Sequence, residues 1–185
     1  MATISDSTVR MSLFHADPIS LMYSVDPDNS GRTGRYNSGF FGLNVARAGT
    51  SRAGVFLEAG KWYHIALTWD VNGKNSDCDI FINGRKKAYF HYTEGMAKDA
   101  PASKLLPPGT DIRLGSGRMS GKIQTGECYD ELRVSRTVRY RDDFAVPTAP
   151  FTPDADTYLL MHFDGNLDGV QNGQPILGKL TRGKM

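Results

Sequence analysis

The stretch from Trp62 to Trp69 constrains the fold of this chain most, because almost all of its residues are strand formers. Alternate residues of a strand point to opposite faces, and here both faces carry bulky side chains. This is typical of a central strand that is covered on both sides. Asn72-Gly73 follows, and the next apolar run ends in a second Asn-Gly pair at 83–84. Since Asn and Gly tolerate the positive φ of a primed turn, the pattern predicts antiparallel hairpins.

Further short alternating runs are separated by Gly, Pro, Asn and Asp, and no segment has a 3.6-residue apolar period of helical length. The pattern predicts an all-β fold, a two-sheet antiparallel β-sandwich of the jelly-roll type. Trp62 and Trp69 are expected to lie in its core, since large aromatics on a central strand are buried for packing. Besides the hairpin strands 62–69 and 79–83, strands are expected at 8–14, 19–25, 40–45, 54–58, 85–92, 111–115, 122–135 and 158–163.

The connections between these runs are uneven in length. Residues 26–39 and 93–109 are predicted to be long surface loops, since they are polar or rich in Gly and Pro. Residues 136–144 are expected to hold one helical turn, and the proline-rich segment 145–153 to run extended. The strand at 158–163 either closes the sandwich beside the N-terminal strand, which we favour, or begins a following repeat.

Composition sets the class of protein. The chain has 185 residues, 39% of them hydrophobic and 23% charged, which predicts a single globular domain over residues 1–185 and excludes a disordered chain. The net charge is +2 with both signs interspersed, so we expect no nucleic-acid partner. No apolar run is long enough to span a bilayer, and the first residues lack a signal-peptide pattern, so we expect no membrane insertion.

Three segments resemble the laminin-G-like domains of the concanavalin-A-like lectin/glucanase superfamily. W-x-H-I-A-L-T-W-D at 62–70, with I-F-I-N-G at 80–84, is similar to the core hairpin of that family. Y-D-E-L-R-V-S at 129–135 is similar to its closing strand, and L-L-M-H-F-D-G at 159–165 to a variant in secreted bacterial and phage-tail proteins. The resemblance covers roughly residues 40–168 and implies the same fold, which hosts lectins, adhesion modules and glycosidases alike.

The resemblance implies a non-catalytic, lectin-like module that attaches a larger extracellular or virion-surface protein to glycans, as an oligomer or as part of a multidomain assembly. A structural, protein-binding domain of a phage tail or surface appendage is the alternative. Sugar recognition needs aromatic platforms and planar polar groups, although Tyr89 and Tyr92 also fit ordinary sheet packing. The candidate carbohydrate-binding residues are Arg35, Tyr36, Asn37, Tyr89, His91 and Tyr92.

A glycoside hydrolase or polysaccharide lyase is the second alternative. Retaining glycosidases hold two carboxylates roughly 5–5.5 Å apart, and Glu127 and Glu131 would share one face of the expected closing strand. Tyr129, however, occupies the position where related glucanases carry an aspartate. We therefore expect no enzyme and interpret Glu131 as a structural residue. His64 and His162 are expected to be satisfied core residues and not bases.

Calcium prefers carboxylate, amide and carbonyl oxygens on loops. Asp164, Asn166 and Asp168 offer such donors at alternate positions, although Asp-Gly-Asn is also an ordinary turn sequence. The resemblance implies one structural Ca²⁺ at this strand end, with an acid of the closing strand nearby, which corresponds to Asp130. The sequence leaves two alternatives open for Cys78 and Cys128, a disulfide between neighbouring strands or two buried thiols.

Overall fold

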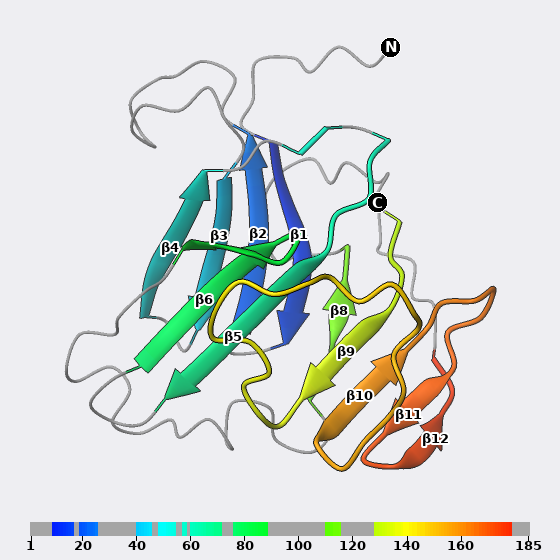
Figure 1. The fold of residues 1–185 in the computed structure, drawn as a ribbon. Helices are drawn as coiled ribbons and strands as arrows, with labels where there is room; N and C mark the ends of the chain where they lie inside the picture. The colour runs from blue at the N-terminus through cyan, green and yellow to red at the C-terminus, as the bar shows by residue number, and fades with distance from the viewer. Residues whose placement is uncertain are drawn as a thin grey trace. The chain divides into compact units, whose positions relative to one another are not determined.

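The computed structural model describes residues 9–16, 19–25, 40–45, 48–54, 57–58, 60–71, 76–88, 110–115 and 128–178. All of the regular structure in these residues is β-strand, and the strands form three antiparallel sheets (Figure 1). The predicted all-β class is confirmed, whereas the sandwich and the jelly roll stay predictions. The chain divides into two compact units, Met1–Thr125 and Gly126–Met185, and the single domain also stays a prediction.

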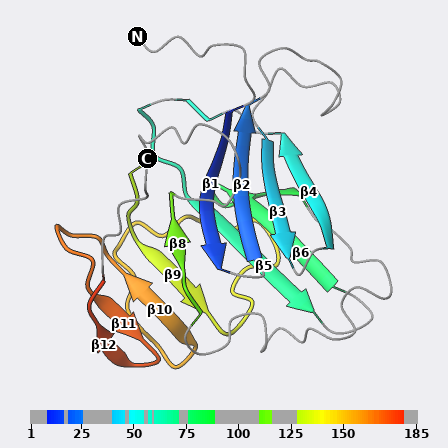
Figure 2. The ribbon, with the colours of Figure 1, turned by 180° about the vertical axis from the view of Figure 1, so that it is seen from behind.

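The first unit contains a five-stranded sheet in the order β4-β3-β2-β1-β8, and Figure 2 shows β1 to β4 side by side. Among the residues of this sheet whose side chains the structure describes, the buried apolar ones are Leu13, Ala16, Ile19 and Leu21, near the turn that joins β1 to β2. Two of the expected strands, 19–25 and 40–45, have the predicted bounds. The strands are β1 (Val9–Ala16), β2 (Ile19–Val25), β3 (Phe40–Val45), β4 (Ala48–Gly54) and β8 (Arg113–Leu114).

The same unit holds a three-stranded sheet of β5 (Ile65–Val71), β6 (Ser76–Ile82) and β7 (Arg85–Ala88). Within the described residues β6 is the middle strand, and its consecutive residues Ile80, Phe81 and Ile82 are all buried. Adjacent residues point to opposite faces, so both faces of β6 are covered. Among the described residues, the middle strand of this sheet is therefore β6 and not the run 62–69.

The turn between β6 and β7 confirms the second predicted hairpin. Asn83 and Gly84 have φ values of 50° and 73°, as a primed two-residue turn requires. The strand before it begins later than expected, at Ile65, so Trp62 precedes the sheet. Its exposed fraction is 68%, and the prediction that Trp62 lies in the core is wrong. The side chain of Trp69 lies outside the described residues.

The second unit contains a four-stranded sheet, seen from yellow to red in Figure 1, in the order β12-β11-β10-β9. Its buried residues come mainly from the central strand β10, namely Tyr158, Leu159 and Leu160, with Val134 from β9. These side chains form the apolar core of this unit among the described residues. The strands are β9 (Leu132–Ser135), β10 (Thr157–Met161), β11 (Gly169–Gln171) and β12 (Gln174–Ile176).

This unit departs from the sequence predictions in several places. Strand β10 pairs with β9 and β11, whereas β1 pairs with β2 and β8, so the expected pairing of 158–163 with the N-terminal strand is wrong. Strands β11 and β12 were not predicted, although Asn172-Gly173 joins them with φ values of 52° and 75°. Residues 136–144 form bends and no helical turn, and residues 128–131 precede strand β9 without belonging to it.

Candidate functional site

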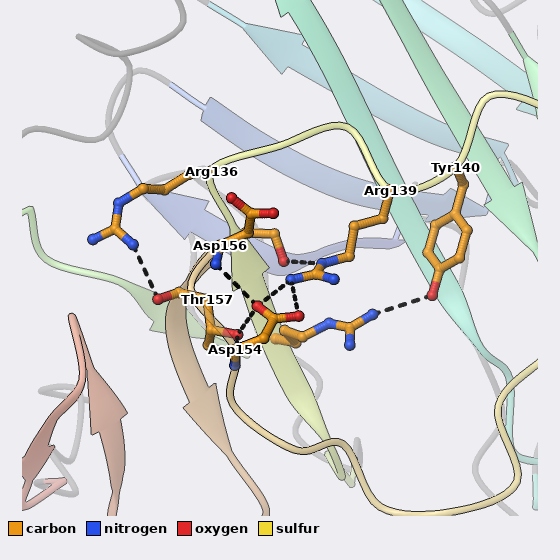
Figure 3. Close-up of polar contacts among 8 residues, drawn as sticks. Arg136, Arg139, Tyr140, Asp154, Asp156 and Thr157 are labelled. Carbon is orange, nitrogen blue, oxygen red and sulfur yellow. Dashed lines mark hydrogen bonds and ion pairs between the residues drawn. The ribbon is translucent and has the colours of Figure 1, made fainter.

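The connection from β9 to β10, residues 136–156, is anchored by one bidentate ion pair. Arg139 donates from Nη2 to both carboxylate oxygens of Asp154, at 2.7 and 2.8 Å, and from Nε to Ser135 Oγ at 2.6 Å (Figure 3). Asp154 Oδ1 also accepts from the hydroxyl of Thr157 at 2.8 Å. The bonds from Arg139, with that from Thr157, lower the pKa of Asp154 to about 2. Asp154 is therefore a fixed anion that ties both ends of the connection together.

Two further arginines stabilise this connection through hydrogen bonds and contacts with aromatic rings. Arg136 donates from Nη1 to the carbonyl of Thr157 at 3.1 Å and from Nη2 to Asn172 Oδ1, and its guanidinium lies 5.6 Å from the centre of the Tyr158 ring. Arg133 donates to the hydroxyl of Tyr140 at 3.2 Å. Its guanidinium also lies 4.0 Å from the ring centre of Phe151.

Both carboxylate oxygens of Glu131, the candidate catalytic acid, have partners within the protein. Its Oε1 lies 2.6 Å from His162 Nδ1, and its Oε2 accepts from the backbone N–H of Phe151 at 2.9 Å. Burial raises the pKa of Glu131, but the bonds from Phe151 and His162 outweigh it and hold this pKa below the ordinary value. A carboxylate that stays ionised and joins three segments fits the structural interpretation of this residue.

The proposed pairing of carboxylates depends on strand alternation, which fails at Glu131. This residue has a φ of 53° and lies outside strand β9, so the regular two-residue alternation expected from Glu127 to Glu131 is broken. Glu127 itself lies outside the described residues. His162 was expected to be a core residue, but 38% of its side chain is exposed and its partner is Glu131. His64 is partly buried beside the start of β5.

The expected calcium ligands Asp130, Asp164, Asn166 and Asp168 are all exposed. Asn166 Oδ1 accepts from the backbone N–H of Asp168 at 2.8 Å, which is the side-chain bond of an Asx turn. Across the described part of the chain, no group of three or more His, Cys, Asp or Glu side chains is gathered as a metal would require. The turn accounts for part of this sequence, and calcium binding stays a prediction.

The candidate carbohydrate-binding residues Arg35, Tyr36, Asn37, Tyr89, His91 and Tyr92 all lie outside the described residues. The bridge between Cys78 and Cys128 stays a prediction as well, because the side chain of Cys78 is not among them. Cys128 is exposed.

The structure reveals a different candidate site, the exposed indole of Trp62. The turn before it is closed by a bond from Lys61 N–H to the carbonyl of Glu58, at 3.4 Å, with Gly60 at a φ of 76°. The hydroxyl of Tyr63 accepts from the backbone N–H of Glu58 at 2.9 Å, and Lys61 Nζ lies 2.7 Å from Glu58 Oε2. Hydrogen bonds of Lys61 and Tyr63 thus hold the backbone immediately before and after Trp62.

The segment that follows Trp62 is hydrogen-bonded to the β6–β7 turn. His64 N–H donates to Asn83 Oδ1 at 2.9 Å, and Asn83 N–H donates to the carbonyl of His64 at 2.8 Å. The sequence did not indicate this site because the run of strand-forming residues begins at Trp62, whereas β5 begins at Ile65.

Comparison of this chain with protein-family models, with curated proteins and with solved structures finds no match. Nothing identifies a laminin-G-like domain, so the resemblance stays a prediction. Within the residues that the structure describes, no helix is long and apolar enough to cross a membrane.

Proposed function

We propose that this chain is a non-catalytic binding module that attaches a larger extracellular or virion protein to carbohydrate. The observation that carries the proposal is that Trp62 is 68% exposed on a segment whose backbone is held by hydrogen bonds. The family resemblance points in the same direction.

Exposure of the indole is informative because large aromatic side chains usually bury most of their surface. The flat apolar face of an indole suits the C–H face of a sugar ring, while its N–H can donate to a hydroxyl. Because the flanking backbone is already held by the bonds of Tyr63 and His64, little further ordering is needed when a ligand binds. Weak single-site binding would be strengthened by repetition in a larger assembly.

The hydrolase alternative is less well supported. The lowered pKa of Glu131 is the opposite of what a general acid needs near neutral pH. The role of an ionised nucleophile is disfavoured for a different reason, because both of its carboxylate oxygens already have partners within the protein. A protein-binding role is favoured by the same observation as sugar binding, because exposed tryptophans are also common hot spots of protein interfaces.

A glycan-array screen tests the proposal, with the intact chain compared with Trp62→Ala. Leu177→Ala is the matched control, because Leu177 is the other large exposed apolar residue in the described part of the chain, at 86%. We expect the intact chain and Leu177→Ala to bind one class of glycan and Trp62→Ala to lose that binding while keeping its melting temperature.

A silent array with all three proteins would contradict the proposal, and a stable multimer or a captured protein would then favour the structural alternative. Repeating the screen with EDTA addresses calcium separately. Loss of binding with EDTA and with Asp164→Asn would support a calcium ion at Asp164, Asn166 and Asp168, whereas unchanged binding would remove it from the proposal.

A further inference from the structure

We propose that the connection 136–156 carries a docking site for a second protein, the Pro-x-x-Pro stretch from Pro150 to Pro153. The partner is a protein module that binds this stretch in a groove lined by aromatic side chains. This interaction surface belongs to the second unit and goes beyond the sugar-binding role proposed for Trp62 in the first. It is carried by the length of the connection, by the spacing and exposure of its prolines, and by the contacts that hold it.

The connection is much longer than its topology requires. It joins β9 to β10, which are antiparallel neighbours in one sheet, and the paired residues Ser135 and Thr157 lie directly at its two ends. Roughly two to five residues suffice for such a hairpin. Residues 136–156 contain no helix or strand. Long loops of this kind are usually either functional or disordered, and the contacts of this one hold it in place.

Prolines recur in this connection at every third position, and Pro147, Pro150 and Pro153 are all exposed. Each proline fixes its own φ at about −65° and disfavours a helical conformation of the residue before it. The chain bends once among them, at Ala149, and runs from Pro150 to Pro153 without a further bend or turn. Since a polyproline II helix repeats every three residues, Pro150 and Pro153 fall on the same edge of this extended stretch.

The backbone of this stretch is available to a partner. Between Pro150 and Pro153, the hydrogen bond that the structure shows is the one from Phe151 N–H to Oε2 of Glu131. No carbonyl group of these residues accepts a hydrogen bond from the described part of the chain. A polyproline II segment keeps its backbone solvated in the same way, and its carbonyls can accept from the O–H of a tyrosine or the N–H of a tryptophan in an aromatic groove.

Contacts on the other side of the chain hold the stretch in its extended form. The half-buried ring of Phe151 lies 4.0 Å from the guanidinium of Arg133, and its backbone N–H is bonded to Glu131. The residue that follows the stretch, Asp154, is paired with Arg139. Because the stretch is already ordered in the free protein, it loses little conformational entropy when a partner binds.

Proline is often exposed, and a proline-rich connection can serve only as a stiff spacer. A spacer is not needed here, since the two strands that the connection joins already lie side by side. Aromatic grooves bind Pro-x-x-Pro segments because these segments are extended before binding. The spacing, the free carbonyls and the fixed backbone of the stretch together meet that requirement.

The test titrates the intact chain with purified SH3, WW and EVH1 domains, three classes of module that bind polyproline segments, and measures binding by calorimetry. We expect at least one of them to bind saturably, and Pro150→Ala with Pro153→Ala to weaken that binding at least about tenfold. Pro147→Ala with Pro175→Ala is the matched control. It removes two exposed prolines outside the stretch, one before the bend and one in β12, and should leave the affinity unchanged.

Melting temperatures establish that both double variants are folded. If Pro150→Ala with Pro153→Ala does not fold, a synthetic peptide of residues 145–153 takes its place. Competition by the peptide would support the inference, and its absence would overturn it. Failure of every module to bind, full binding by the Pro150 and Pro153 variant, or an equal loss in both double variants would also overturn it. Trp62→Ala should bind the modules as the intact chain does, so this inference and the proposed function can fail separately.

Discussion

The Nδ1 atom of His162 lies 2.6 Å from Oε1 of Glu131, one step beyond the last pair of the β9–β10 ladder, Leu132 and Met161. Glu131 and Phe163 both have a left-handed backbone, with φ values of 53° and 64°. Through its second oxygen, Glu131 also holds the backbone of Phe151. One carboxylate thus joins the end of the ladder to the long connection.

We expect Glu131→Gln to destabilise the protein by about 1 kcal/mol, because an amide loses the charged interaction with His162 but keeps an acceptor for Phe151 N–H. Glu131→Ala removes both acceptors and should cost about 2–3 kcal/mol. Urea unfolding at neutral pH measures both. Glu58→Gln is the control, since it removes a carboxylate from an exposed pair. Equal effects at the two positions would show that the Glu131 contacts contribute little.

The same pair predicts a dependence on pH. The pKa of Glu131 is lower in the folded chain than in the unfolded one, so its stabilisation is present above the unfolded value and is lost as pH falls through the folded value. The difference in unfolding free energy between the intact chain and Glu131→Gln should therefore shrink on acidification. A constant difference would contradict the pKa assignment.

The ionised carboxylate of Asp154 should make a second contribution to the stability of the folded chain, one that is lost in acid. Its pKa falls from an ordinary value of 3.8 to about 2, mainly through Arg139, so the stabilisation is present above about pH 4 and disappears towards pH 2. Asp154→Asn should lower the melting temperature modestly at neutral pH and progressively less in that window. Arg139→Lys keeps the charge but has no second nitrogen to donate to Ser135 Oγ, so it should reproduce part of the loss. Wild-type behaviour of Arg139→Lys would show that charge alone matters.

The Asn83 position tests the turn that supports Trp62. Asn83→Gly keeps the positive φ and loses the side-chain bond to His64, so we expect a cost of about 0.5–1.5 kcal/mol. Asn83→Ala loses the bond and adds a left-handed alanine, which costs a further 1–2 kcal/mol or so. Thermal unfolding of the two variants gives their order. An alanine variant as stable as the glycine variant would argue against a strained turn.

Trp62 and Phe81 should behave in opposite ways although both are large aromatics. Trp62→Ala should change the unfolding free energy by no more than about 0.5 kcal/mol, because the side chain is exposed. Phe81→Ala should cost about 3–5 kcal/mol, since Phe81 is completely buried. Chemical denaturation distinguishes them. A large loss in Trp62→Ala would mean that the indole has a structural role and would weaken the proposed function.

The sequence by itself determined the elements that depend on local patterns. The bounds of β2 and β3 follow from apolar runs that end at turn residues, and Asn83-Gly84 adopts the positive φ values that its residue types favour. The same rule applies at Asn172-Gly173, where three-residue strands were too short to show an alternating pattern. Local signals therefore identify an all-β chain and most of its described hairpins.

Only the tertiary structure decided which side chains are covered and which charges meet. Trp62 was expected in the core as a bulky member of one alternating run, but its burial depends on where the ladder begins, and β5 begins only at Ile65. Glu131 meets His162 and Phe151 across separations of 31 and 20 residues, through a backbone conformation that alternation does not anticipate. Periodicity describes the faces of one segment, whereas such contacts depend on how distant segments pack.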